Sequence, residues 1–195
     1  MESQPGRRAQ LPVHAHSHRE NGQTFLRFTE QLNQHHDAEQ FLLALPSLLH
    51  NLVPATTFTV LDLDGSSPAS RAFVHSRNGE TLPPPNLLSG RPSACSWVQE
   101  NQQPLVIPSI ATESRFPDTR EWFRSSGDRS LCMLPLRTSV RRLGVLCAGR
   151  SSEDAFSEEE IALLTLAADY AALAMDDRLN FAASEKARLD WSGSS

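Results

Sequence analysis

The fold of this 195-residue chain is decided by residues 130–177, which read SLCMLPLRTSVRRLGVLCAGRSSEDAFSEEEIALLTLAADYAALAMDD. Short apolar runs at 131–136 and 143–147 flank a polar, basic turn at 139–142. Two such runs joined by a turn are typical of an antiparallel β-hairpin with one face in a core. The sequence therefore predicts a hairpin here, followed by a helix.

The start of that helix is marked by a capping box. Ser157 precedes Glu160 by three residues, so its hydroxyl can accept from the Glu160 amide while the Glu160 carboxylate accepts from the Ser157 amide. Phe156 and Ile161 occupy the positions of a hydrophobic staple, and three consecutive glutamates suit the positive end of the helix dipole. We expect the helix to begin directly after Ser157.

Weaker patterns extend the prediction toward the N-terminus. Helical spacing begins at Phe25 and resumes after Asp37, a residue type that caps helices. Pro46 is expected to kink or break this second helix near Ala44. The later elements are expected as strands at 57–63 and 71–75, a short helix at 93–101 capped by Ser93, a short strand at 105–110, and an aromatic loop with a helical turn at 112–127. This order predicts an α+β fold whose antiparallel sheet is flanked by helices.

Composition and net charge indicate which classes of protein this chain can belong to. The chain is 39% hydrophobic and carries a formal net charge of -5, which allows one substantial core and argues against binding to nucleic acid. Three cysteines without a CxxC pair indicate reduced thiols in the cytoplasm. The N-terminus has no apolar core of a secretory signal. The longest apolar stretch, 161–175, is interrupted by Asp169 and is shorter than the about 20 residues of a membrane span.

We divide the chain into three parts. Residues 1–22 are rich in Pro, Gly, Arg, His and Gln and are expected to form a disordered tail. The folded domain is expected at 23–180, and 181–195 extend its last helix into a frayed end. Alternating histidines at positions 14, 16 and 18 lack the carboxylate or thiolate support of a structured metal site, so no metal is expected.

Three segments of the chain resemble a GAF domain, a small sensory module of signalling proteins. They are SWVQENQQPLVIPSI at 96–110, SLCMLPLRTSVRRLGVLCAG at 130–149 and AFSEEEIALLTLAADYAALAMDD at 155–177. The resemblance spans 23–180 and is nearest to the input domains of sigma-54-dependent transcriptional activators and of sensor histidine kinases. It implies a five- or six-stranded antiparallel sheet with the terminal helices on one face. A loop-roofed ligand pocket is implied on the other face, with 112–127 in the roof.

Specialised members of the family carry signatures that can be checked here. The Asn-Lys-Phe-Asp-Glu set of cyclic-nucleotide-binding members does not occur as a run. Cys95, Cys132 and Cys147 have no adjacent histidine of the kind that accompanies bilin attachment. Free-methionine sulfoxide reductases share the fold and use several cysteines, so an enzyme of that type stays an alternative. Cys132 and Cys147 lie in apolar strand runs, where a small buried side chain is the ordinary interpretation.

Residues 93–129 hold the candidate ligand-binding side chains. The first cysteine lies at the start of the predicted short helix, where the helix dipole would favour a reactive thiolate. Aromatic side chains could line a pocket and arginines could supply charge for an anionic ligand, while core packing and solvation are the competing interpretations. The predicted ligand-binding residues are Cys95, Trp97, Phe116, Arg120, Trp122, Phe123 and Arg129. No motif indicates a catalytic residue or a metal ligand, and the sequence does not identify a cofactor.

The last predicted helix carries an apolar stripe that could pack within the domain or on a second copy. Small and apolar residues recur every three or four positions from Ile161 to Leu189. Arg178 and Glu185 would occupy seam positions of a long coiled coil. We therefore expect a homodimer formed through the terminal helices, without an extended coiled coil.

The favoured hypothesis is a non-catalytic cytoplasmic domain that senses a small molecule or redox state. It would pass the change through its terminal helices to a protein partner or an output domain, in signal transduction or transcription regulation. The alternatives are an enzyme of the free-methionine sulfoxide reductase type and a ligand-free dimerisation module. Neither nucleic acid nor a membrane is expected as a direct partner.

Overall fold

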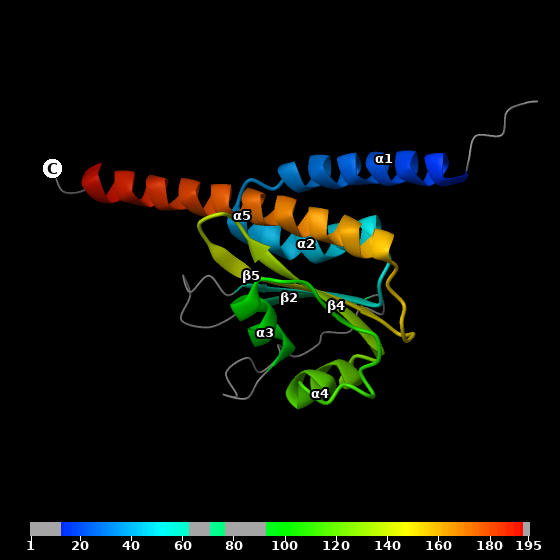
Figure 1. Ribbon diagram of the computed structural model, residues 1–195. Coiled ribbons are helices and arrows are strands. Elements are labelled where there is room, and N and C mark those ends of the chain that lie inside the picture. Colours follow the sequence, from blue (N-terminus) through cyan, green and yellow to red (C-terminus); the bar gives the residue numbers. More distant parts are fainter. Residues whose placement is uncertain (1–12, 63–70, 77–92, 193–195) are drawn as a thin grey trace, which may run out of the picture.

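The computed structural model describes residues 13–62, 71–76 and 93–192, and these form an α+β fold (Figure 1). Five antiparallel strands build one sheet in the order β2-β1-β5-β4-β3. The helices are α1 Val13–Asn33, α2 Ala38–Leu52, α3 Ala94–Asn101, α4 Pro117–Ser125 and α5 Glu158–Ser192. The strands are β1 Thr57–Asp62, β2 Arg71–Ser76, β3 Leu105–Ile107, β4 Ser130–Arg137 and β5 Arg142–Arg150. The predicted fold class is confirmed.

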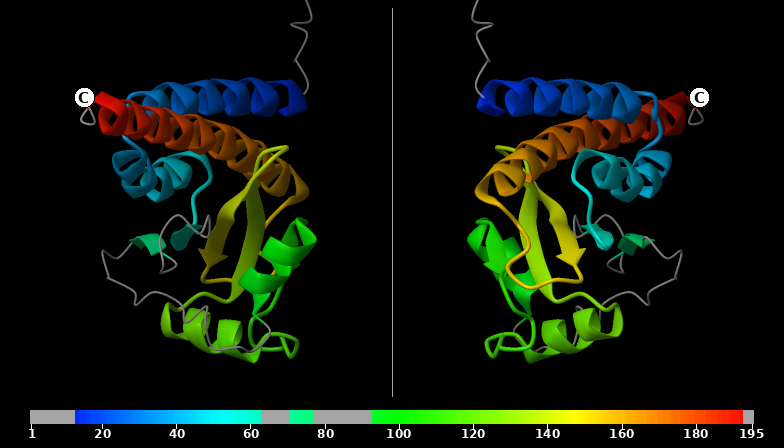
Figure 2. Two further views of the ribbon diagram at one scale, coloured as in Figure 1. Left: turned by 90° about the vertical axis from the view of Figure 1, so that its left-hand side faces the viewer. Right: turned by 90° about the vertical axis from the view of Figure 1, so that its right-hand side faces the viewer.

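The sheet separates two layers of helices. α1, α2 and α5 lie on one side of it, and α3 and α4 lie on the other (Figures 1 and 2). Side chains alternate between the two sides because successive residues of a strand point to opposite faces. On β1, Val60 belongs to the core under the long helices and Leu61 to the core under α3 and α4. The core under the long helices, here called the helical core, includes Phe28, Leu32, Phe41, Leu45, Leu49, Phe58, Cys132, Leu146, Ala148, Leu164, Ala168 and Met175.

The hairpin and the helix start at 130–177 form as predicted. β4 pairs with β5 so that Cys132 lies opposite Ala148. The Ser157 amide donates to Glu160 Oε2 at 3.0 Å, and the Glu160 amide donates to Ser157 Oγ at 3.2 Å. Phe156 is buried in the helical core. The capping box therefore fixes where α5 begins.

α1 docks on α5 through aromatic and polar contacts. The ring of Phe25 meets Tyr170 edge-on with centroids 6.2 Å apart. Arg178 of α5 donates to the carbonyls of Leu32 and His35 at 3.3 and 2.6 Å. The Leu32 carbonyl lies in the last turn of α1 and the His35 carbonyl lies just beyond it, so the arginine caps the C-terminal end of α1 across the interface.

Two expectations for the N-terminal helices are corrected. The predicted disordered tail is wrong for residues 13–22, which are helical, while residues 1–12 lie outside the described residues. Once a helix is nucleated, elongation into a polar segment is cheap, and the packed part of α1 supplies the nucleus. We predicted a kink or a break near Ala44, and the break does not occur, because α2 runs continuously through Pro46. Pro46 is buried between Leu45 and Leu49, and core packing compensates for the missing hydrogen bond.

The predicted roof segment at 112–127 contains more structure than a single turn. α4 has nine residues, and Pro117 stands at its first position, where a missing N–H is harmless. The amide of Ala94 at the start of α3 donates to Thr119 Oγ1 of α4 at 3.0 Å. The two short helices are therefore joined into one cover. Within the described ranges, no helix combines the length and apolarity that a membrane span requires.

Candidate functional site

The sheet face beneath α3 and α4 is covered by an apolar layer, here called the α3–α4 layer. It draws side chains from four strands, both short helices and the segment between β3 and α4. Its buried members are Leu61, Ala94, Cys95, Val98, Leu105, Ile107, Ile110, Phe116, Phe123, Leu131, Met133, Val145 and Cys147. A buried apolar face with loops around it is the common setting of a small-molecule site.

Five of the seven predicted ligand-binding residues meet in this layer. Cys95, Phe116 and Phe123 are buried members. Trp97 and Trp122 are partly buried and pack against it. The prediction thus identified one spatial cluster, although the interaction of these side chains with a ligand stays a prediction.

The two predicted arginines lie apart from the aromatic cluster. Arg120 Nη1 donates to the carbonyl of Glu113 at 3.4 Å, which makes it a brace for the loop before α4. Arg129 is exposed and lines a separate hollow at the end of the sheet. Charge and aromatic surface are therefore not presented to one ligand by the whole predicted set.

The three thiols are free and buried. Cys95 is only 4% exposed, so it lacks the access that the reactive-thiolate interpretation requires. A hydrogen bond with Cys95 and burial both raise the pKa of the Cys147 thiol. Burial raises the pKa of Cys132 to about 12. Reactive thiolates are therefore disfavoured at Cys132 and Cys147.

Asp128 is a buried carboxyl that was not among the predicted ligand-binding residues. Its Oδ2 accepts from Thr57 Oγ1 and from Ser126 Oγ, both at 2.6 Å. Its Oδ1 is buried without a hydrogen-bond partner among the described residues. Burial raises the pKa of this carboxyl, against the effect of the two hydroxyls. Gly149 of β5 makes the space, since a Cβ there would overlap the carboxylate.

A hollow beside Asp128 runs between the end of α4 and the loop after β5, and we call it the Asp128 groove. Its volume is about 280 Å³. It is lined by Ile110, Ala111, Arg124, Gly127, Asp128, Arg129 and Glu153. Of the seven predicted ligand-binding residues, Arg129 lines this groove. Asp128 follows a glycine and reads as an ordinary turn residue, so its burial could not be foreseen.

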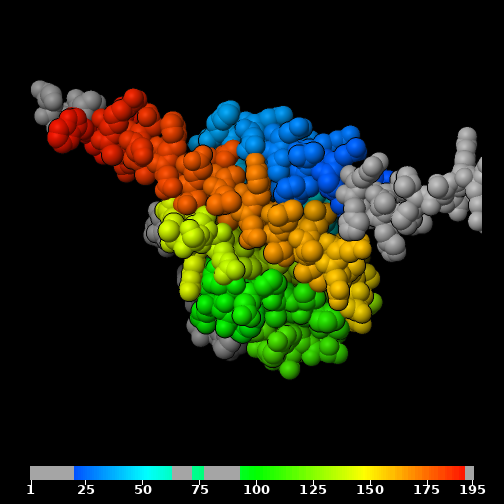
Figure 3. All heavy atoms as spheres, turned by 45° about the horizontal axis from the view of Figure 1, so that its top comes forward, coloured from blue at the N-terminus to red at the C-terminus, as the bar shows by residue number. Residues whose placement is uncertain are grey.

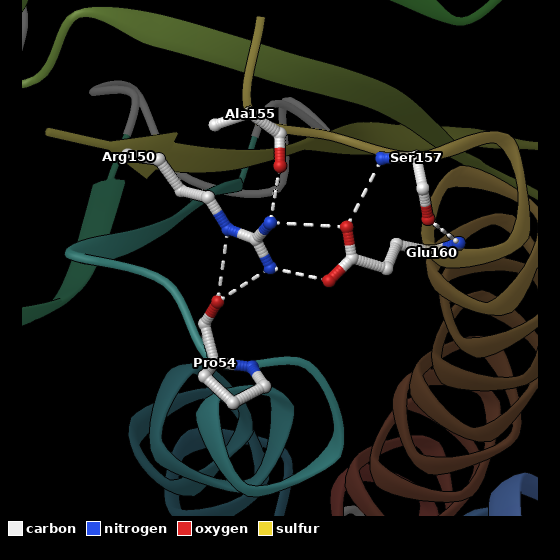
Figure 4. A network of polar contacts seen from close by, with 5 residues as sticks. All are labelled: Pro54, Arg150, Ala155, Ser157 and Glu160. Carbon is white, nitrogen blue, oxygen red and sulfur yellow. Dashed lines mark hydrogen bonds and ion pairs between the residues drawn. The ribbon is translucent and has the colours of Figure 1, made fainter. Parts of the chain in front are cut away.

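Arg150 ties the end of β5 to the start of α5 (Figure 4). Its guanidinium donates to Glu160 Oε1 and Oε2 at 2.6 and 3.0 Å, and twice to the carbonyl of Pro54. It also donates to the carbonyl of Ala155. The same Glu160 carboxylate accepts from the Ser157 amide, so the ion pair and the capping box form one network. Strand, loop and helix start are held together at this point.

Metal ligation finds no support in the described part of the chain, which contains no group of three or more His, Cys, Asp or Glu side chains placed to hold an ion. The side chains at positions 14, 16 and 18 lie outside the described ones. The expectation that these three histidines bind no metal therefore stays a prediction.

A family model described as GAF domain matches residues 22–175. The chain belongs to the GAF domain family. No curated protein sequence matches it. The GAF domain of a phosphoenolpyruvate-protein phosphotransferase from Coxiella burnetii is 16% identical, with a TM-score of 0.66 over 84% of this chain and 96% of that one.

Two other solved structures extend the comparison. The GAF domain of a two-component sensor histidine kinase from Bacillus halodurans is 17% identical, with a TM-score of 0.59 over 70% of this chain and 91% of that one. The free methionine-R-sulfoxide reductase from Neisseria meningitidis, in complex with its substrate, is 17% identical, with a TM-score of 0.64 over 82% and 90%. At these identities the likeness shows a shared GAF fold and no shared activity.

Proposed function

We propose that this GAF domain is a non-catalytic sensor in which β5 transmits a change on the ligand-facing side of the sheet to α5. The supporting observation is that β5 contributes to both cores and is tied to α5 at each end. Val145 and Cys147 belong to the α3–α4 layer, whereas Leu146 and Ala148 belong to the helical core. A ligand that prefers one position of β5 would therefore also select a position of α5.

Two arginines make the ties. Arg150 holds Glu160 in the first turn of α5, with its side chain 18% exposed. Arg141, which precedes β5, holds Asp176 at 2.8 Å, about four and a half turns further along α5 than Glu160. A strand and a helix joined at two separated points cannot slide independently. This arrangement supports rigid coupling between the two layers.

We further propose that the terminal helices form a homodimer. Leu166, Leu173 and Phe181 of α5 are between 51% and 68% exposed, and Leu26 of α1 is 62% exposed. The C-terminal part of α5 stands away from the rest of the domain (Figure 3). Exposed large apolar side chains on adjoining helices favour a protein partner, here a second copy. Such a pair of helices would carry the signal to an output domain or protein partner, in signal transduction or transcription regulation.

A catalytic role of the reductase type is less well supported than sensing. Cysteine chemistry needs an accessible thiolate, and all three thiols are buried. Free, reduced thiols suit the cytoplasm, where we place the protein. Turnover of free methionine sulfoxide by the purified chain with a dithiol reductant would overturn the non-catalytic assignment.

The sensor proposal is tested with the full chain in two steps. Native mass spectrometry and a thermal-shift screen of metabolites identify a ligand that raises Tm by about 2 °C or more, which is the shift expected for about 1 kcal/mol. Hydrogen exchange is then measured across 158–180 with and without it. We expect slower exchange there in the wild type, and a weakened response with retained binding in Arg150→Gln.

Arg188→Gln is the matched control, because Arg188 pairs with Glu185 on the exposed end of the same helix. Binding without any change at 158–180 would refute transmission through β5. A chain that binds no metabolite but remains dimeric would instead be a ligand-free dimerisation module.

A further inference from the structure

We propose that the Asp128 groove is the ligand site of this sensor and that it takes a small zwitterion such as a free amino acid. The ligand carboxylate would face Arg124 and Arg129, and its ammonium group would face Glu153. The proposal rests on the sensory function and adds its site and ligand class.

The groove is small and its walls are held by hydrogen bonds. The Ile110 amide donates to the Arg129 carbonyl at 2.8 Å, which joins two sides of the hollow. Ser109 Oγ donates to Glu153 Oε1 at 3.0 Å, which fixes the loop after β5. The volume of about 280 Å³ lies just below the range of about 300–1,000 Å³ typical of sites for drug-sized ligands. The size and rigidity therefore suit a molecule of few heavy atoms.

Charges of both signs line the groove and are not paired with each other. Within the described residues, the guanidinium groups of Arg124 and Arg129 have neither an ion pair nor a hydrogen bond. Glu153 accepts from a neutral hydroxyl, and Asp128 Oδ1 has no described partner. An anion alone would meet the repulsion of the carboxylates, and a cation alone would meet that of the guanidinium groups. A zwitterion satisfies both sets.

Asp128 lies beneath the surface and contributes through its charge. It is 3% exposed and carries an oxygen without a described partner, so a nearby ammonium group would stabilise its ionised form. Burial raises the pKa of Asp128 when the groove holds no cation, which agrees with this role. The buried carboxyl thus adds selectivity for a positive group over a neutral one.

The groove also adjoins the tie between β5 and α5. The Arg129 amide donates to the Arg150 carbonyl at 2.6 Å, and the side chain of Arg150 holds Glu160. A ligand that draws Arg129 inward would therefore act on the backbone of Arg150, whose side chain holds the first turn of α5. A backbone hydrogen bond therefore joins the proposed ligand site to the strand that would transmit the signal.

The test measures binding to the full chain by calorimetry, after a thermal-shift screen with the common L-amino acids as probes. The best probe is compared with its desamino carboxylate and its decarboxylated amine. We expect each half-molecule to bind at least tenfold more weakly than the zwitterion, because each loses charge-assisted hydrogen bonds. A desamino acid that binds as tightly as the amino acid, or an amino-acid panel without any binding, overturns the proposal.

Variants locate the site. Arg129→Gln should weaken binding of the amino acid about tenfold or more, whereas Glu153→Gln should reduce the preference for the amino acid over its desamino analogue. Arg137→Gln is the control, because Arg137 is also exposed but lies at the other end of β4. Binding that is unchanged in Arg129→Gln overturns the site. If another metabolite still binds and alters α5, the sensor proposal survives that loss, and if none does, both fail.

Discussion

The network at Arg150 and the site at Asp128 lie next to each other, but each contains a carboxyl group whose pKa is shifted in the opposite direction. Glu160 accepts two hydrogen bonds from Arg150 and one from the Ser157 amide. Burial opposes ionisation of Glu160, but the hydrogen bonds and charge of Arg150, with the cap, lower its pKa on balance. The partners of Asp128 among the described residues are both hydroxyls, and burial raises its pKa.

The difference separates a structural network from a site that can respond. A charge whose partners are all supplied by the protein holds two elements in one arrangement. A buried carboxyl with an unpartnered oxygen can still be stabilised by binding a proton or by a nearby cationic group. Four experiments test this contrast, from the largest expected effect to the smallest.

The largest effect is expected from Gly149→Ala. The added Cβ would overlap the Asp128 carboxylate, so we expect the free energy of unfolding to fall by about 2 to 3 kcal/mol. Urea denaturation at neutral pH measures it. In an Asp128→Ala background the same change should cost much less, because the colliding group is gone. Equal losses in both backgrounds would show that the glycine serves another purpose.

Arg150→Ala should destabilise the domain by about 2 kcal/mol, because it leaves the half-buried Glu160 and the Pro54 carbonyl without their donor. Urea denaturation gives the value. Arg150→Lys should recover part of it, since a point charge keeps the ion pair but not the forked geometry. A loss no greater than that of Arg188→Ala at the exposed end of α5 would contradict a structural role for the network.

The two carboxyls should give opposite pH dependences of stability. Asp128 has a pKa raised from 3.8, so its contribution is present below that value and is lost as pH rises through the raised pKa. Glu160 has a pKa lowered from 4.5, so its contribution is present above that value and is lost as pH falls through the lowered pKa. Asp128→Asn and Glu160→Gln each remove one of these slopes.

Unfolding free energies between pH 3 and pH 8 measure both slopes. The slope removed by Asp128→Asn can reach at most about 1.4 kcal/mol per pH unit, the limit for one group. Asp128→Asn should therefore gain stability relative to the wild type on going from acid to neutral pH. A difference between the two proteins that does not vary with pH would mean that Asp128 titrates as an exposed carboxyl does.

Arg141→Gln should have the smallest effect, about 0.5 kcal/mol. Arg141 is 35% exposed, so solvent screens its pair with Asp176 more than it screens Arg150. Hydrogen exchange should nevertheless rise around 173–180 of α5, where the tie is lost. If Arg141→Gln destabilises the domain as much as Arg150→Ala, the closed network is not the stronger of the two ties.

Local patterns were enough for the fold, because their partners are close in sequence. The capping box joins Ser157 and Glu160 across three positions, and the β4–β5 hairpin pairs its strands through a short turn. Asp37 likewise caps α2 through the amides of Glu39 and Gln40. The disordered tail was mispredicted over 13–22, since the polar composition there does not reveal that packing of later turns nucleates the helix.

The candidate site was predicted only in part. Aromatic and cysteine residues of the segment 93–129 were expected to gather and do so, because apolar side chains within one segment share the nearest core. The burial of Asp128 was not foreseen because its environment comes from Thr57 and Gly149, which are distant in the chain. A carboxyl beside a glycine looks the same whether it is solvated or buried.

The sequence by itself determined the α+β class, the hairpin, the start of α5 and membership of the GAF family. Hydrogen bonds across three residues and alternating apolar runs are encoded locally, so they can be recognised without coordinates. Only the tertiary structure decided that Arg150 is fully engaged while Asp128 keeps an oxygen without a described partner. Burial and pairing depend on which distant segments meet, and that is a property of the packed fold and not of any one stretch of chain.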